Sequence, residues 1–430
     1  MSVLRSRPRG DIVHRLSAVD AQTYWMSAKI PNDTVLLYGF AGAPAEPEAA
    51  IEEIIERAGD CPDLTVCVEE GGFLTYPAWV HRGVDRSMFV LHGVEGLTFR
   101  QCLEQVGEVT GRPLDARAAA WRLHVFVGVE GVPDVVGPGT VAVLQISHAL
   151  GGGGRMSAPA AIMLGRRDGL VRGVDVSRTP MHLAVSGFRA ARAHRRLVED
   201  TDAGRVPPPA ELRPVLRTND RPAGPRNLRI VTRRRSDLSG STVTIAALSA
   251  ISVALAEHLR CLGEDPSTLG AEVPMTKPPP RLAYNHFGNV GVGLYPELAE
   301  SERGARIAAD LDARRRRAAH PAIRVADLAF ASTPAPLLRW GMDRFDPDVR
   351  VPRVTGNTVV SSVNCGPMDF HLGGAPVTMA CAFPGLSPMM GLTHAVCGVG
   401  DAISISVHAA ESAIGDIDAY VDRLEAALPR

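Results

Sequence analysis

The run TVAVLQISHA at residues 140–149 constrains the fold more than any other segment of the sequence. It is almost continuous in valine, alanine, leucine and isoleucine, which is typical of a strand covered on both faces. Amphipathic helices are also present, the clearest at 47–59, which has proline at its start and glycine at its end. These patterns together predict an α/β fold.

Length and composition favour a folded chain of two domains or one large α/β unit. The sequence has 430 residues, of which 45% are apolar and 22% charged, and this excludes a largely disordered protein. A formal net charge of −1 gives no sign of nucleic-acid binding. Only Lys29 and Lys277 are lysines, and the other 44 basic residues are arginine. We interpret this bias as the mark of a GC-rich, actinobacterial genome.

The element pattern suggests two lobes. A segment rich in proline and charge at 199–227 is the predicted linker between an N-terminal lobe at 1–198 and a C-terminal lobe at 228–430. Further predicted helices cover 16–28, 98–109, 242–261, 298–318 and 416–428. Predicted strands cover 34–40, 87–94, 122–129, 286–295, 357–364, 375–383 and 402–409.

Cysteine usage and apolar segments indicate a cytoplasmic protein. The seven cysteines include no C-x-x-C pair, which argues against a disulfide framework and against a zinc site. The N-terminus has no apolar core of a signal peptide. The apolar run at 242–256 is too short for a bilayer span of about 20 residues, so we expect a buried helix there and only peripheral membrane contact, if any.

The most informative candidate site is ISHALGGGGR at 146–155. His148 at the end of a buried strand is well placed for base chemistry, because the strand fixes the imidazole and its pKa lies near neutral pH. The glycines that follow allow close approach of backbone and substrate. The alternative is a structural histidine beside a turn, and this segment alone does not decide between them.

The surrounding sequence resembles a known family. PLD at 113–115 and Trp121 precede a strand, and a second strand then ends in S-H-A-L-G-G-G. This order resembles the wax ester synthase/diacylglycerol acyltransferase (WS/DGAT) family of the CoA-dependent acyltransferase superfamily, whose motif is H-H-x-x-x-D-G. Ser147 takes the place of the first histidine and His148 matches the second, the family's catalytic base. Gly152 replaces the aspartate, and Gly153 matches the motif glycine.

Further segments extend the resemblance along the chain. LSAVD at 16–20, RPAGPRNLR at 221–229 and the stretch at 273–296 are similar to family segments. The most similar stretch is SSVNCGPMDFHLGGAPVTMACAFPGLSPMMGL at 361–392, and the family's closing strand, turn and helix follow it.

The resemblance implies a two-lobe, chloramphenicol-acetyltransferase-like fold with mixed sheets, flanking helices and a central channel. It implies an O-acyltransferase that uses acyl-CoA as co-substrate, without a permanently bound cofactor or metal, and a diacylglycerol or long-chain alcohol as hydroxyl acceptor. His148 would be the general base. The glycine N–H groups or the Ser147 hydroxyl would stabilise the oxyanion. Contact with a membrane or lipid droplet would be peripheral.

Departures from the family pattern leave alternatives open. The first histidine and the aspartate of the motif are absent, and the family's N-D helix start is replaced by Ser241 and Thr242. In the superfamily that aspartate braces the histidine loop through an arginine, and four consecutive glycines predict a more flexible loop here. A catalytically impaired or dead lipid- or acyl-CoA-binding scaffold is one alternative. An acyltransferase for a natural-product hydroxyl or amine is the other.

Other candidate residues carry weaker signals. Of two arginine-rich segments, 226–235 is a better candidate for the CoA phosphates than 314–317, which is typical of a solvated helix face. His371, His394 and His408 lack a metal-ligand pattern and are predicted to be structural. No G-x-G-x-x-G motif suggests dinucleotide binding.

Overall fold

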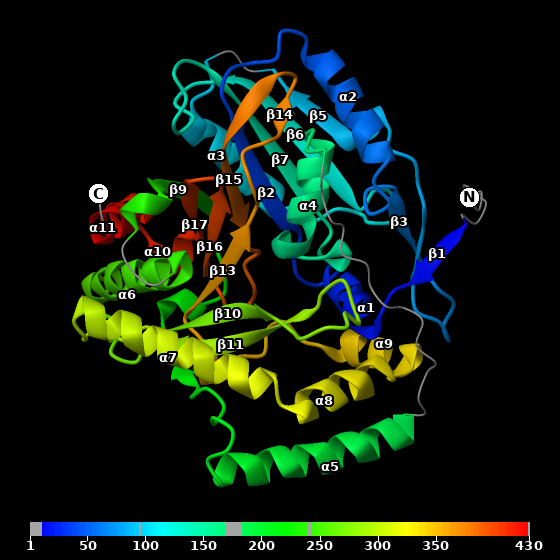
Figure 1. The fold of residues 1–430 in the computed structure, drawn as a ribbon, viewed down its shortest axis with the longest axis vertical. Coiled ribbons are helices and arrows are strands. Elements are labelled where there is room, and N and C mark those ends of the chain that lie inside the picture. The colour runs from blue at the N-terminus through cyan, green and yellow to red at the C-terminus, as the bar shows by residue number, and fades with distance from the viewer. Residues whose placement is uncertain (1–10, 94–95, 168–182, 239–241, 429–430) are drawn as a thin grey trace.

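The computed structural model describes residues 11–93, 96–167, 183–238 and 242–428. Two six-stranded mixed sheets form its centre, and helices cover both (Figure 1). In Figure 1 the first sheet lies in the upper half and the second sheet below and to its left.

The first sheet has the strand order β14-β15-β2-β7-β6-β5. The pair β5–β6 is parallel and the remaining pairs are antiparallel. Every residue of β7 is buried, as predicted for a strand covered on both faces. The strands are β2 (Thr34–Phe40), β5 (Phe89–His92), β6 (Trp121–Val129), β7 (Gly139–Ile146), β14 (His371–Leu372) and β15 (Ala375–Phe383).

The second sheet has the order β11-β10-β13-β16-β17-β9. Its central pairs β10–β13 and β13–β16 are parallel, and its outer pairs are antiparallel. The strands are β9 (Arg226–Arg234), β10 (Gly270–Thr276), β11 (Phe287–Gly293), β13 (Thr358–Asn364), β16 (Leu392–Val399) and β17 (Ala402–Ala410).

Three helices cover the first sheet. Alternation along β7 divides its side chains, so that Leu144 packs with α2 (Pro47–Gly59) and α4 (Gly153–Met163), whereas Val143 packs with α3 (Phe99–Thr110). The bounds of α2 are those predicted. Proline begins this helix, and Ile51 and Ile54 turn its apolar face to the core.

The second sheet packs against α6 (Val243–Cys261), α7 (Glu300–Ala318) and α11 (Ile417–Ala427). Among the described helices, only α6 is long and apolar enough to cross a membrane, and 61% of it is buried. It lies against the sheet, α7 and α11, so the predicted buried helix is confirmed (Figure 1). Asp416 caps α11 by accepting hydrogen bonds from the N–H groups of Asp418 and Ala419.

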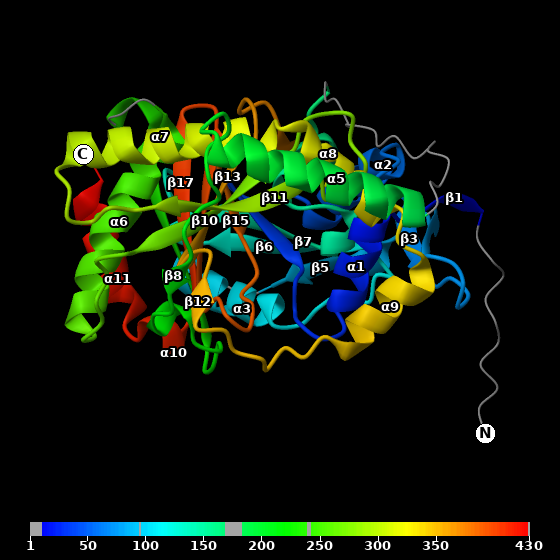
Figure 2. The ribbon, with the colours of Figure 1, turned by 90° about the horizontal axis from the view of Figure 1, so that it is seen from below.

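Small sheets, further helices and 3-10 turns complete the fold (Figure 2). Small sheets are formed by β1 (Ile12–Arg15), β4 (Ala78–His81) and β3 (Val66–Glu69), and by β12 (Arg353–Val354) with β8 (Arg213–Pro214). The other helices are α1 (Ala18–Met26), α5 (Leu183–Asp202), α8 (Pro321–Ala331), α9 (Ala335–Arg344) and the short α10 (Glu411–Ile414). Short 3-10 turns are η1 (Arg86–Met88), η2 (His148–Leu150), η3 (Arg217–Asn219) and η4 (Arg235–Asp237).

Sheet pairing crosses the predicted lobe boundary at one place. The strands β14 and β15 belong to the C-terminal part of the chain, yet β15 pairs with β2 in the first sheet. The division into 1–198, 199–227 and 228–430 stays a prediction. The segment 199–227 contains the end of α5, the short β8 and η3, and its last two residues begin β9.

Candidate functional site

A cavity of about 670 Å³ lies between the two sheets. One wall is formed by the turn after β7 and the start of α4, including His148 and Gly152. The opposite wall is formed by β10, β11, β13 and the segment 351–355. The cavity therefore brings residues from both halves of the sequence to the predicted base.

His148 lies two residues beyond the end of β7 and begins η2. Its side chain is half-buried, with one side toward the cavity and its ring 6.2 Å from the ring of Phe287, measured between centroids. Nδ1 is buried without a hydrogen-bond partner among the described residues. Burial lowers the pKa of His148, outweighing the opposing effects of its own main chain and of Asn285. The imidazole is therefore neutral at pH 7.

The four glycines after this turn are more ordered than a flexible loop. Gly151 has φ of 125°, and a side chain there would meet Arg155. Gly152 has φ of −75° and is the N-cap of α4, whose first residues are Gly153 and Gly154. The expectation of a loose loop is thus replaced by a helix start beside His148. A Cβ atom on Gly152 would lie 3.8 Å from Nε2 of that histidine.

The other motif positions have different surroundings. Ser147 is buried, its N–H donates to the carbonyl of Ala120 at 2.8 Å, and it does not line the cavity. The Ser147 hydroxyl is therefore misplaced for the oxyanion role considered above. Gly153 does line the cavity, and a Cβ atom there would lie 3.2 Å from Leu36, so the glycine permits close packing against β2.

A buried ion pair braces the turn that carries His148. Arg155 on α4 contacts Asp63, from the connection between α2 and β3, at 2.8 Å, and their side chains are only 5% and 8% exposed. The guanidinium also donates to the carbonyl of Leu150 at 3.2 Å and lies 3.8 Å from the ring centroid of Tyr284. In the family pattern, an aspartate at the position of Gly152 would bind an arginine elsewhere. Here the two charges are exchanged, because the arginine, Arg155, follows the turn directly and its partner Asp63 comes from another segment.

A second buried carboxylate joins this turn to the other half of the chain. Asp20 accepts hydrogen bonds at 2.9 Å from the main-chain N–H groups of Tyr284 and Asn285. The side-chain amide of Asn285 donates to Asp20 at 3.0 Å and to the carbonyl of His148 at 2.8 Å. Burial raises the pKa of Asp20, and these neutral donors oppose that rise. Ser17 is the N-cap of α1, and its side chain accepts a hydrogen bond from the N–H of Asp20.

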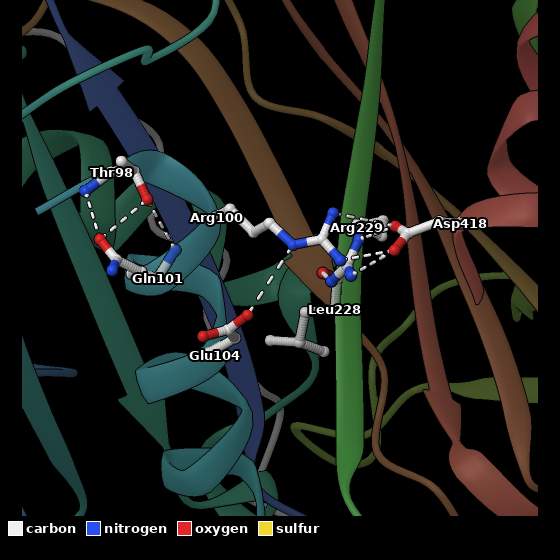
Figure 3. Close-up of polar contacts among 7 residues, drawn as sticks. All are labelled: Thr98, Arg100, Gln101, Glu104, Leu228, Arg229 and Asp418. Atoms are coloured by element: carbon white, nitrogen blue, oxygen red, sulfur yellow. Dashed lines mark hydrogen bonds and ion pairs between the residues drawn. The ribbon is translucent and has the colours of Figure 1, made fainter. Parts of the chain in front are cut away.

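The arginine-rich segments do not line the cavity. Arg229 on β9 and Arg100 on α3 both contact Asp418 on α11, with Arg229 Nε 2.6 Å from its Oδ1 (Figure 3). Hydrogen bonds from the two arginines lower the pKa of Asp418 to about 2. In the other segment, Arg314 donates to the carbonyl of Pro208. Arg229 and Arg314, one from each segment, thus hold elements together.

His371, His394 and His408 do not line the cavity. His394 hydrogen-bonds with Thr358 and Tyr420 in the buried second sheet, and His408 with the carbonyl of Pro384. These two are structural, as predicted, whereas His371 lies in a separate small hollow beside Arg57. All seven cysteines are free, and the described residues contain no cluster suited to a metal ion.

Two mixed α/β lobes with a cavity between them are the arrangement expected of a CoA-dependent acyltransferase fold. Residues 288–430 match the family model of the WS/DGAT C-terminal domain. The predicted resemblance to the WS/DGAT family is thus confirmed, with the sequence match itself confined to this C-terminal third. No curated protein matches the sequence significantly.

Solved structures confirm the predicted two-lobe fold over the whole chain. The wax ester synthase/diacylglycerol acyltransferase of Marinobacter aquaeolei has a TM-score of 0.59 at 17% identity, covering 96% of this chain and 97% of that one. A trichothecene 15-O-acetyltransferase of Fusarium sporotrichioides gives 0.57 at 10%, covering 96% and 94%. A mutant starter condensation domain of rhizomide synthetase in complex with C8-CoA gives 0.54 at 13%, covering 95% and 92%. At these identities the likeness shows the fold alone.

Proposed function

We propose that the protein transfers a fatty acyl group from acyl-CoA to a hydroxyl acceptor, with His148 as general base. The observation that carries this proposal is a half-buried, neutral imidazole that faces the cavity between the lobes. A base of lowered pKa is in its working form at neutral pH. Long-chain alcohols and diacylglycerol are the acceptors to assay first, because the family resemblance suggests them.

The reaction needs one proton to move twice. His148 Nε2 takes the proton of the acceptor hydroxyl as the oxygen attacks the thioester carbonyl. The tetrahedral intermediate collapses, the carbon–sulfur bond breaks, and the imidazolium returns the proton to the CoA thiolate. Acyl transfer in one displacement requires no nucleophilic serine. This agrees with Ser147 being buried outside the cavity.

The start of α4 is suited to stabilise the oxyanion. Gly152, Gly153 and Gly154 line the cavity, and the first N–H groups of a helix have no partner within the helix. The positive end of the helix dipole adds to their effect on a developing negative charge. We assign the oxyanion to these main-chain groups.

A cluster of cations near the cavity fits the CoA phosphates. Arg281 and His286 line the cavity, and Lys277 directly follows β10. Burial lowers the pKa of His286, the hydrogen bond to the Pro278 carbonyl opposes this, and the charges of Arg281, Lys277 and Arg324 lower it further. Asp327 contacts Lys277 at 2.6 Å. We propose this cluster for the donor phosphates in place of 226–235.

An exposed apolar surface next to α9 fits peripheral lipid contact in the cytoplasm. Phe73 and Leu74 are 74% and 76% exposed, and Leu337 and Trp340 on α9 are 48% and 55% exposed. The loop and the helix are neighbours, because the Tyr76 hydroxyl donates to the carbonyl of Thr333 just before α9. Tryptophan with nearby arginines is typical of a lipid interface.

CoA release tests the proposed function. The wild-type protein is incubated with palmitoyl-CoA alone, with hexadecanol and with diacylglycerol, and free thiol and acyl product are measured. We expect acceptor-dependent release and an ester product. If palmitoyl-CoA binds but none of these acceptors, nor a panel of polar alcohols and amines, gives product, the protein is a non-catalytic acyl-CoA-binding scaffold.

Flotation with liposomes tests the lipid contact. A variant with Phe73→Ser and Leu74→Ser should lose flotation that the wild type shows. Val136→Ser is the matched control, because Val136 is fully exposed on the connection between β6 and β7. Equal flotation of all three proteins would contradict the contact.

A further inference from the structure

Polar side chains interrupt the otherwise mostly apolar wall of the cavity opposite His148. Residues alternate along β10, so that Ala271 and Val273 enter the core under α6 while Glu272 lines the cavity. The same alternation on β13 places Ser361 on the cavity side, and β11 contributes Asn289. A carboxylate, a hydroxyl and an amide therefore share this wall.

Glu272 has no positive partner in the described part of the chain. Its half-buried carboxylate accepts one hydrogen bond, from Nδ2 of Asn289 at 3.1 Å, and takes part in no ion pair. Burial raises the pKa of Glu272 and the hydrogen bond opposes this rise. Removing a carboxylate from water is unfavourable unless a cation or several donors compensate. The open side of this carboxylate faces the cavity, where a ligand can supply the charge.

The pairing of strands gives the position of Glu272 relative to the base. Thr276 pairs with Phe287, and the Phe287 ring lies beside His148. Glu272 lies four residues before Thr276 on the same strand, about 13 Å away at roughly 3.3 Å per residue. Lys277 and Arg281 come after Thr276, at the other end of β10. Glu272 and the cations Lys277 and Arg281 therefore lie toward opposite ends of β10, whereas Arg353 on the same wall donates to the carbonyl of Leu212 at 2.8 Å.

We propose that Glu272 recognises the acceptor and that this acceptor carries an ammonium group roughly one strand length from its reacting hydroxyl. The inference rests on the proposed function and names its substrate class as amino alcohols. The phosphates of CoA would be repelled by the carboxylate and attracted by the cations, so the two substrates bind at opposite ends. An aliphatic amine with a pKa near 10.4 is protonated at neutral pH, so it binds as a cation while the hydroxyl is acylated.

Competition between matched acceptors tests this proposal. The probes are α,ω-amino alcohols of four to twelve carbons, each paired with the n-alkanol of equal length, with palmitoyl-CoA as donor. We expect kcat/KM for one of the longer amino alcohols to exceed that for its alkanol by about tenfold or more, with the ester identified by mass spectrometry. Glu272→Gln keeps the shape and removes the charge, and it should bring this ratio close to one.

Glu297→Gln is the control for loss of one negative charge. Glu297 is exposed, pairs with Arg260 and does not line the cavity, so the ratio should stay at the wild-type value. Equal kcat/KM values for the two probe classes, or a ratio that survives Glu272→Gln, would overturn the proposal.

Direct binding separates this inference from the proposed function. Isothermal titration of the same amino alcohols and alkanols into wild type and Glu272→Gln requires no turnover. Tighter binding of amino alcohols that Glu272→Gln removes would support the recognition site even if no acceptor is acylated. Equal binding of both probe classes to the wild type would overturn the site, whether or not acyl transfer occurs.

Discussion

The two walls of the cavity are built by different means. The wall with His148 is a 3-10 turn followed by a helix start, and it is held by two buried carboxylates, Asp63 through Arg155 and Asp20 through Asn285. The opposite wall is regular sheet, in which alternation along β10 and β13 decides which side chains face the cavity. The wall with His148 thus depends on distant side chains, and the sheet wall depends on backbone pairing.

This difference indicates where substitutions will have effects. A change in the turn can displace the base through loss of a distant partner, and small displacements of a catalytic group cost much rate. A change on the sheet wall alters the groups that meet the substrate while the strands stay paired. Activity and stability should therefore be linked at the first wall and separable at the second.

The largest effect is expected from His148→Ala. Loss of a general base lowers the rate by about 10²–10⁴-fold, whereas the fold should persist because Asn285 binds the main-chain carbonyl that alanine retains. The measurement is kcat/KM for CoA release, with thermal unfolding and acyl-CoA binding as controls for fold and site.

The pH profile sharpens the same prediction. The base acts only when neutral, so the wild-type rate should rise with pH through a pKa below 6.5 and be level above it. A variant with full activity, or a wild-type rate that falls as pH rises from 5 to 7, would show that another group is the base.

Sequence reasoning predicted most of the elements and proposed His148 as the base, but it did not predict the two buried carboxylates that hold the turn. Local patterns were sufficient for β7, α2 and α11, because periodicity and capping residues are contained within each segment. No strand was proposed at 392–399, yet β16 is there, with His394 buried. The partner of Arg155 lies 92 residues away, and no local pattern pairs the two.

The motif comparison likewise could not show what replaces the missing aspartate. Loss of the family residue at Gly152 suggested a weakened loop, whereas a charged brace of opposite polarity is present at Arg155 and Asp63. Glu272 was missed because one carboxylate in a strand is an ordinary feature. Only the structure shows that Glu272 lines the cavity and takes part in no ion pair among the described residues.

The next largest effect is expected from breaking this ion pair. Arg155→Met leaves Asp63 buried and unpaired, and removal of one partner of a buried pair costs about 3–5 kcal/mol of unfolding free energy. The double variant with Asp63→Leu should recover much of this loss, because both charges are then absent. Denaturant unfolding of the single and double variants measures this.

The activity of the double variant then shows whether the Arg155–Asp63 pair positions the turn or only stabilises the fold. The double variant lacks the bond from Arg155 to the Leu150 carbonyl, so its kcat should stay reduced even with stability restored. Arg112→Met is the matched control, because Arg112 and Glu108 are 80% and 68% exposed and such pairs contribute under about 1 kcal/mol. Full activity of the double variant would contradict the positioning role.

The smallest expected effect comes from Gly152→Asp, which restores the family residue at the helix start. Gly152 is the N-cap of α4 with negative φ, so aspartate can cap the helix and reduce the entropy of the unfolded chain, a combined gain of about 0.5–1 kcal/mol. Its carboxylate would lie beside Nε2 of His148 and favour the imidazolium, which should shift the midpoint of the rate profile upward by about one pH unit or less. Gly152→Asn is the control, because it caps the helix without charge and should leave the midpoint in place. A large loss of stability in both variants would mean that the space beside His148 admits no side chain, and the glycine would then be required by packing.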